Sequence, residues 1–191
     1  MSQNIEAEDR CMISESDYVR IFNDYKDYSN AKFLVLTNYY FDDDNLSIRN
    51  SHKMLRIRST DNDNFELTLK IKGENGDLEI NEPLSKNQVD KVLKTLIFPE
   101  GEISSHLREF TNIRFITSLV TERLEIPIED YLLVIDKNKY GDVIDYNIEI
   151  EAKNIKKARE LMLAYCNKYN LNYSPNYESK SRRAINKALK D

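Results

Sequence analysis

The chain of 191 residues has few glycines, prolines and cysteines. Four glycines and four prolines are too few for a collagen-like or Pro/Gly-rich disordered protein. The two cysteines, Cys11 and Cys166, form no CxxC pair and cannot build a disulfide framework, so we interpret both as buried thiols. The sequence is therefore neither a disulfide scaffold nor a low-complexity chain.

Long apolar runs and an excess of basic residues are also absent. No apolar run approaches the length of a bilayer span, and the acidic N-terminal segment has no apolar stretch typical of a signal peptide. The net charge of −5 argues against a nucleic-acid binder or a membrane-surface protein, because both need a basic excess, but it permits a small enclosed basic site. We therefore expect a soluble cytoplasmic protein with one domain over residues 1–191.

Strand-like segments rich in β-branched and aromatic residues dominate the sequence. The eight predicted strands are Ile5–Ile13, Lys32–Asp42, Met54–Ser59, Phe65–Ile71, Asp77–Pro83, Ile113–Ile126, Tyr131–Lys139 and Val143–Ala152. Short polar links, such as Asp61–Asn64 and Lys139–Asp142, join successive strands, and links of this length connect antiparallel neighbours. The predicted fold class is α+β with mostly antiparallel strands.

Helical segments interrupt the strands. The predicted helices are Glu15–Tyr28, Lys86–Ile97, Glu102–Phe110, Ile155–Tyr169 and Glu178–Lys190. Ser85 followed by Gln88 matches a capping box, and Val89 and Val92 begin an apolar stripe in the helix that follows. Such stripes predict helices that pack against the sheet on one side.

Most of the predicted strands have one apolar and one charged face, because side chains alternate along a strand. Leu55 and Ile57, for example, oppose Arg56 and Arg58. One interpretation is an open sheet whose charged face meets water. However, the charged faces carry long residues of both signs, and long antiparallel strands must protect their edges, which closure into a barrel achieves. We predict an eight-stranded closed β-barrel (a tunnel) with helices packed outside and the charged faces inside.

A charged interior must be wet, internally paired or filled by a charged ligand. Arginines and lysines that converge from several strands suit a compact polyanion, because guanidinium groups match phosphate oxygens. Carboxylates beside them would repel that anion unless a hard cation such as Mg²⁺ lies between the two. The pattern predicts a metal–polyphosphate site in the interior, and ion pairing without a ligand is the alternative.

Seven short motifs occur in order along nearly the whole chain. They are Glu6–Arg10, Asn38–Asp42, Leu55–Arg58, Leu67–Lys70, Leu133–Asp136, Tyr146–Glu151 and Ser179–Arg183. In this order they resemble the CYTH family, also called triphosphate tunnel metalloenzymes, whose ExExK signature is similar to Glu6–Arg10. The family includes class IV adenylate cyclases, thiamine triphosphatases and inorganic tripolyphosphatases. The resemblance implies an eight-stranded antiparallel tunnel with helices outside.

The resemblance also implies roles for individual residues. The implied ligands of Mg²⁺ or Mn²⁺ are Glu6, Glu8, Glu149 and Glu151, with Asp136 and Glu79 as secondary candidates. The implied phosphate-binding cations are Arg10, Arg56, Arg58, Lys70, Arg123, Lys180 and Arg183. Lys180, as a base or a ligand of the leaving group, and Tyr40 are the candidate catalytic residues.

Two positions depart from the family pattern. Arg10 stands where the signature has lysine, and Asn147 stands where the eighth strand often has glutamate. We expect a metal-dependent hydrolase of inorganic tripolyphosphate, thiamine triphosphate or a nucleoside triphosphate. No nucleic-acid or membrane partner is expected, and a monomer and a homodimer both remain open. An adenylate cyclase, and a sensor that binds polyphosphate or a nucleotide without turnover, are the alternatives.

Overall fold

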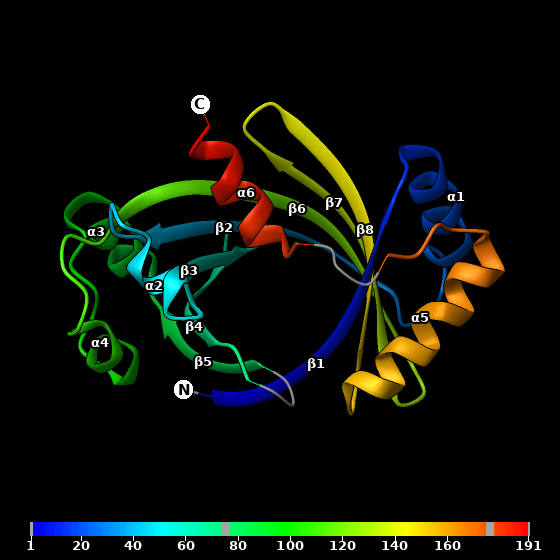
Figure 1. The fold of residues 1–191 in the computed structure, drawn as a ribbon, viewed down its shortest axis with the longest axis horizontal. Coiled ribbons are helices and arrows are strands. Elements are labelled where there is room, and N and C mark those ends of the chain that lie inside the picture. Colours follow the sequence, from blue (N-terminus) through cyan, green and yellow to red (C-terminus); the bar gives the residue numbers. More distant parts are fainter. Residues whose placement is uncertain (1, 74–76, 175–177, 191) are drawn as a thin grey trace.

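The computed structural model describes residues 2–73, 77–174 and 178–190, and for residues 2–6 it describes the backbone only. The strands are β1 (Ser2–Ile13), β2 (Lys32–Asp42), β3 (Lys53–Thr60), β4 (Asn64–Ile71), β5 (Asp77–Leu84), β6 (Arg114–Ile128), β7 (Tyr131–Tyr140) and β8 (Val143–Ala152). The helices are α1 (Glu15–Tyr25), α2 (Ser47–Asn50), α3 (Lys86–Thr95), α4 (Glu102–Leu107), α5 (Ile155–Tyr169) and α6 (Lys180–Ala188) (Figure 1). The eight predicted strands are confirmed, and α2 is an addition to the predicted helices. Within these residues, no helix combines the length and apolar character that a membrane crossing needs.

All eight strands form one antiparallel sheet, in the order β1-β5-β4-β3-β2-β6-β7-β8. β1 contributes to both ends of this order, because Ser2–Glu6 pairs with β5 and Ala7–Ile13 pairs with β8. The hydrogen-bonded ladder therefore returns to its first strand. The α+β class and the eight antiparallel strands agree with the prediction.

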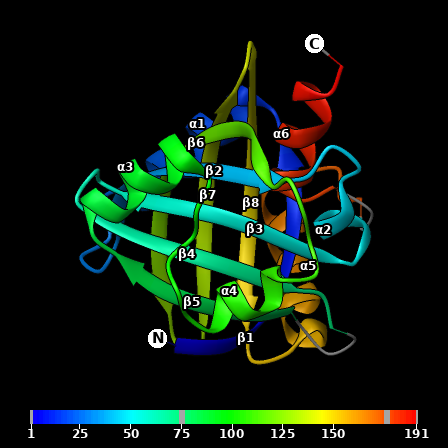
Figure 2. The same cartoon turned by 90° about the vertical axis from the view of Figure 1, so that its left-hand side faces the viewer.

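The two faces of the sheet are separated as predicted. On β6, β7 and β8, apolar residues such as Ile135 and Ile148 pack outward against α1 and α5, where Met162 completes a core. On β3, β4 and β5, apolar residues such as Leu67 pack outward against α3 and α4 around Val89. Figure 2 shows α3 and α4 over the β3–β5 strands, with β7 and β8 crossing behind them. The charged faces are left to the inside.

Local hydrogen bonds define where the helices begin. Ser85 and Gln88 form the predicted capping box at the start of α3. Asn154 caps α5, and Ser179 caps α6. The short helix α2 depends on a more distant group, because the Asp42 carboxylate at the end of β2 accepts the backbone N–H groups of residues 48 and 49, each at 3.0 Å. This carboxylate therefore fixes α2 beside the sheet.

Helix α6 differs from the expectation that every helix packs on the outside. Its Ala184 and Ile185 form a small core with Tyr40, Leu119 and Tyr140. Figure 1 shows α6 between β2 and the β7–β8 hairpin, over one end of the sheet's interior. The helix therefore carries its first residues into the region that the charged strand faces surround.

Candidate active site

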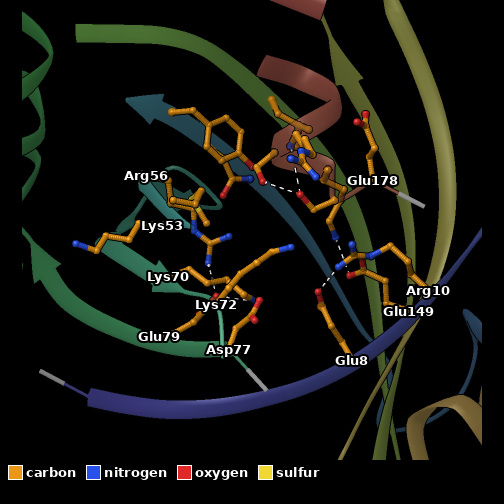
Figure 3. Close-up of a pocket in the computed structure, with 18 of the residues that line it drawn as sticks. Glu8, Arg10, Lys53, Arg56, Lys70, Lys72, Asp77, Glu79, Glu149 and Glu178 are labelled. Carbon is orange, nitrogen blue, oxygen red and sulfur yellow. Dashed lines mark hydrogen bonds and ion pairs between the residues drawn. The ribbon is translucent and has the colours of Figure 1, made fainter. Parts of the chain in front are cut away.

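The inner face of the sheet and the start of α6 surround a cavity of about 530 Å³. Figure 3 shows charged side chains from several strands that point into this shared space. The predicted site residues that line it are Glu8, Arg10, Tyr40, Arg56, Arg58, Lys70, Glu79, Arg123, Glu149, Glu151 and Lys180. Glu6 lies in β1 opposite Asp77, but its side chain falls outside the described residues. The cavity thus brings together most of the residues that the sequence singled out.

Three carboxylates on neighbouring strands form a candidate metal site. Glu8, Glu149 and Glu151 each offer an oxygen, and these oxygens lie within 4.8 Å of one another. The pairing of β1 with β8 creates this cluster, because Glu8 lies directly opposite Glu151 and Glu149 shares the face of Glu151 on the same strand. Carboxylate oxygens are the ligands that Mg²⁺ and Mn²⁺ prefer. The donor set therefore fits a hard divalent cation.

Glu149 is also the centre of an ion-pair network. Lys180 Nζ lies 2.8 Å from Glu149 Oε2, and Arg123 Nη2 lies 3.2 Å from the same oxygen. Arg10 Nε lies 3.2 Å from the other oxygen, Oε1, and the same guanidinium donates to Glu8. Burial alone would raise the pKa of Glu149, but the surrounding cations, chiefly Lys180 and Arg10, outweigh it and hold the pKa well below its usual range. The carboxylate is therefore ionised at neutral pH.

Asp136 lies fully buried behind this network. Arg123 binds its carboxylate with two hydrogen bonds of 2.9 and 3.0 Å, Lys180 donates at 2.5 Å, and Asn147 donates at 3.3 Å. Burial would raise the pKa of Asp136, but Arg123 and Lys180 lower it. The carboxylate is not part of the three-membered cluster that the described residues form. Its contacts indicate that it orients Arg123 and Lys180, and the amide of Asn147 supports it with a donor that glutamate lacks.

The opposite wall, formed by β3, β4 and β5, is rich in cations. Lys70 Nζ lies 3.3 Å from Glu79 Oε1, and Arg56 Nη2 lies 3.7 Å from the same oxygen. Lys70 also lies 3.6 Å from Asp77. Burial would raise the pKa of Glu79, but Arg56 and Lys70 lower it. Glu79 therefore serves as an ionised counter-ion for this wall.

Arg58 on the same wall has much weaker compensation. Its Nε donates to Asn38 Oδ1 at 3.0 Å, and no carboxylate among the described side chains lies within ion-pair distance. Burial lowers the pKa of Arg58 to about 10, and the neighbouring cations Arg56 and Arg123 act in the same direction. A partly buried guanidinium without a directly paired carboxylate in the described part of the chain is an attractive partner for a phosphate oxygen.

Buried polar atoms without partners lie on the same wall. Arg56 Nε, Thr68 Oγ1 and Asn81 Oδ1 have no hydrogen-bond partner within the described part of the chain. The strand register places these three residues side by side across β3, β4 and β5. Of the three, Arg56 lines the cavity. A ligand oxygen at Arg56 would remove part of the desolvation cost of this wall.

The two candidate catalytic residues occupy different surroundings. Lys180 is the first residue of α6 and directs its ammonium at the carboxylates of Asp136 and Glu149. Tyr40 is 2% exposed, and its ring belongs to the small core under α6 with Leu119. Burial raises the pKa of the Tyr40 hydroxyl. Tyr40 therefore has the surroundings of a packed aromatic residue, and its catalytic role stays a prediction.

Arg183, a predicted phosphate ligand, is engaged in anchoring α6. Its Nε and Nη2 bind the Asp145 carboxylate at 2.8 and 3.0 Å, and Nη1 donates to the carbonyl oxygen of Glu178 at 2.7 Å. Nη2 also lies 3.3 Å from Asn147 Oδ1. A phosphate contact by Arg183 would require the pair with Asp145 to open.

Some lining residues have no strong signal in the sequence. Asn38 orients Arg58, and its signals in the sequence are its place at the start of the Asn38–Asp42 motif and on the same face of β2 as Tyr40. Three further lining residues come from α2 and the start of β3 and were not predicted: Arg49, His52 and Lys53. They follow from the position of α2, which the sequence pattern does not reveal.

Comparisons with known proteins agree with this geometry. Residues 4–183 match the family described as the CYTH domain. The chain is 32% identical, over 168 residues and 84% of each chain, to the Bacillus subtilis protein named "Putative triphosphatase YjbK". A crystal structure from Bacillus halodurans, described as "a putative adenylate cyclase", is 28% identical with a TM-score of 0.86 over 96% of this chain and 98% of that one. HpAC1 from Hippeastrum, described as having a dominant triphosphatase activity, shares the fold with a TM-score of 0.79 at 18% identity over 96% of both chains. This chain therefore belongs to the CYTH family.

Proposed function

We propose that this protein is a metal-dependent hydrolase of a triphosphate that binds in a tunnel enclosed by the eight strands. The observation that carries the proposal is the complementarity of the two walls of the cavity. Carboxylates gather on β1 and β8, whereas β3 and β4 present Arg56, Arg58 and Lys70. A triphosphate with a bound divalent cation needs both kinds of group. The name of the Bacillus subtilis relative supports the same activity.

Glu8, Glu149 and Glu151 are the proposed ligands of Mg²⁺ or Mn²⁺, and Glu6 stays a candidate from the family resemblance alone. When bound, such a cation neutralises phosphate oxygens and makes a bound water more acidic. Asp136 is assigned a positioning role, since its oxygens already accept hydrogen bonds from Arg123 and other donors.

The cations of the cavity bind and stabilise the phosphate chain in this proposal. Charge on a transferred phosphoryl group is spread over several oxygens, so fixed cations on more than one side stabilise the transition state. Arg56, Arg58 and Lys70 act from one wall, and Arg123 and Lys180 act from the other. Most of the rate enhancement would therefore come from positioning and charge stabilisation rather than from covalent chemistry.

We favour Lys180 as a ligand of the leaving group over Lys180 as a base. Its Nζ donates to two carboxylates at 2.5 and 2.8 Å, which is the arrangement of an ammonium group. An ammonium group held in this way can offer a remaining proton to a phosphate oxygen that gains charge as the anhydride bond breaks. Rotation of Lys180 is restrained because α6 is anchored through Arg183 and Asp145.

The test is release of inorganic phosphate from tripolyphosphate, thiamine triphosphate and ATP, each with Mg²⁺ or Mn²⁺ and with a chelator as the control. We expect metal-dependent release from at least one of them. Cyclic AMP among the products of ATP would instead support a cyclase. Binding of all three compounds without any product would contradict the hydrolase proposal and support a sensor. The pairing of Arg10 with Glu8 and Glu149 is the observation that favours a sensor.

A further inference from the structure

The carboxylates of the candidate metal site already have cationic partners from the chain itself. Arg10 donates through Nε to Glu149 Oε1 at 3.2 Å, and its Nη2 donates to Glu8. One guanidinium therefore bridges two of the three carboxylates in the cluster. The register explains the bridge, because Arg10 is directly opposite Glu149 and shares a face of β1 with Glu8.

A divalent cation in this cluster would compete with Arg10 for the same oxygens. A metal bound to Glu8 and Glu149 would share the two oxygens that accept hydrogen bonds from Arg10, and two like charges a few ångströms apart in a partly dry site repel strongly. Arg10 cannot avoid this repulsion by losing a proton, because its guanidinium stays charged at any physiological pH. The guanidinium must therefore move away when the metal arrives.

A bound anion would give Arg10 a new partner inside the cavity, beside the carboxylates of Asp77 and Glu79 that already line it. Arg10 lines the cavity, and its side chain is 18% exposed, so rotation toward the interior does not require the backbone to move. The opposite wall presents Arg56 and Arg58, and these cations would repel an arriving guanidinium. A bound polyphosphate would reverse that repulsion by placing oxygens between the walls.

We propose that Arg10 is an exchangeable counter-ion. It neutralises Glu8 and Glu149 while the site is empty, and it transfers to a phosphate oxygen when a divalent cation takes its place. The idea rests on the proposed function for the identity of the metal and the anion. Its consequence is thermodynamic: metal and polyphosphate bind with positive coupling, and by linkage each raises the affinity for the other by the same factor.

Arginine suits this exchange better than the lysine of the family signature. Its planar fork reaches both carboxylates at once and can later bind a phosphate through two parallel hydrogen bonds. A lysine ammonium is a single point charge with a shorter reach to the second carboxylate. The substitution at this position therefore predicts stronger coupling, together with weaker binding of the metal alone, than a lysine would give.

The test is calorimetric titration of Mn²⁺ into the intact protein, with and without a nitrogen-bridged tripolyphosphate analogue that is not hydrolysed. The variants are Arg10→Gln, Arg10→Lys and the control Arg114→Gln, whose arginine forms an exposed pair with Asp44. We expect Arg10→Gln to bind Mn²⁺ alone about fivefold or more tightly than the wild type, and to show a coupling factor smaller by a similar ratio. The Mn²⁺ affinity and the coupling factor of Arg10→Lys should lie between those of Arg10→Gln and the wild type. Both values for Arg114→Gln should match the wild type.

Equal or weaker binding of Mn²⁺ by Arg10→Gln, in protein whose thermal unfolding remains cooperative, would overturn the proposal. So would an unchanged coupling factor in both Arg10 variants. Because the readout is binding, the result is independent of turnover. Loss of coupling in Arg10→Gln without phosphate release from the wild type would leave the exchange standing and the hydrolase proposal contradicted. Phosphate release by the wild type, together with equal Mn²⁺ affinities of the wild type and Arg10→Gln, would support the hydrolase proposal and overturn the exchange.

Discussion

Arg123 on β6 and Arg58 on β3 face the same cavity, yet their surroundings differ. Arg123 has two hydrogen bonds to Asp136 and a contact of 3.2 Å to Glu149, and these carboxylates raise its pKa well above the usual value against the effect of burial. Arg58 has the amide of Asn38, and burial lowers its pKa to about 10. One wall is neutralised within the protein, and the other is left short of negative charge.

The difference indicates which side of the cavity is suited to a metal and which to an anion. The carboxylates on β1, β7 and β8 are kept ionised by Arg10, Arg123 and Lys180, and in the proposed exchange a metal would displace Arg10. On β3, the partly buried guanidinium of Arg58 has no carboxylate within ion-pair distance among the described side chains, which costs stability until an anion binds. The carboxylate side of the cavity is therefore stable without a ligand, whereas the side of β3 and β4 favours the binding of an anion.

The largest expected effect is on the carboxylate wall. Glu149→Gln removes a proposed metal ligand and the common partner of three cations, so we expect metal-dependent activity to fall by about 10³-fold or more. The free energy of unfolding should fall by about 3 kcal/mol, because buried cations lose their counter-charge. Phosphate release and urea unfolding measure the two effects.

Glu122→Gln is the matched control for Glu149→Gln. Glu122 forms a half-exposed pair with Lys137 on the outer surface of β6. The activation free energy of the reaction and the free energy of unfolding should therefore both stay within about 0.5 kcal/mol of the wild type. Equal activities of the two variants would show that Glu149 holds no metal.

The next effect compares the two arginines directly. Arg123→Met leaves Asp136 without its main partner and removes one of the three cations beside Glu149, so it should lower the free energy of unfolding by about 3–5 kcal/mol. Arg58→Met removes a poorly compensated charge and should raise it by about 1 kcal/mol, while weakening tripolyphosphate binding by about 1.5–3 kcal/mol for each charge-assisted hydrogen bond lost. Urea unfolding and calorimetry give both values. A loss of stability of similar size in both variants would show that the two walls do not differ.

Asn147→Asp sharpens the account of the carboxylate wall. The substitution replaces the amide that donates to Asp136 with a second buried carboxylate beside it. We expect stability to fall by about 1–3 kcal/mol, an amount limited by the nearby guanidinium of Arg183. Urea unfolding tests it. An unchanged stability would mean that Arg183 fully compensates the new charge.

The smallest expected effect is on the acid dependence of stability. Asp136 and Glu149 have pKa values below their usual range in the folded protein, so their stabilising contribution is complete above the unfolded values near about 4 and is lost as the pH falls below them. The free energy of unfolding should fall by up to about 1.4 kcal/mol per pH unit for each group. Asp136→Asn should show a shallower decline between about pH 5 and about pH 3 in urea unfolding. Identical slopes would contradict the assignment.

Much of the fold follows from local patterns in the sequence. The alternation in the predicted segments gave β2 and β8 their bounds, and helical spacing gave α5 its bounds. Helix α2 could not be predicted in this way, because its four residues are too few for a periodic pattern and its N–H groups depend on Asp42. The position of α6 depends likewise on a tertiary ion pair, between Arg183 and Asp145.

The site was predictable in composition but not in its pairings. Alternation placed Arg56, Arg58 and Glu149 on the charged strand faces, because inward and outward residues follow a period of two. It did not identify Arg49 and Lys53, and Lys180 was singled out by the family resemblance. It could not distinguish Glu149, whose oxygens group with those of Glu8, from Asp136, whose oxygens are held by Arg123. That difference depends on strand register and on the length of each side chain. The side-chain lengths can be read from the sequence, but the alternation pattern does not encode the register.

The most direct test of the central claim is a crystal structure with Mn²⁺ and the tripolyphosphate analogue bound. The account predicts an anomalous Mn²⁺ signal at Glu8, Glu149 and Glu151, with the phosphate chain between that metal and the Arg56, Arg58 and Lys70 side chains. A phosphate chain on the outer surface, or Mn²⁺ bound away from these three carboxylates, would contradict it.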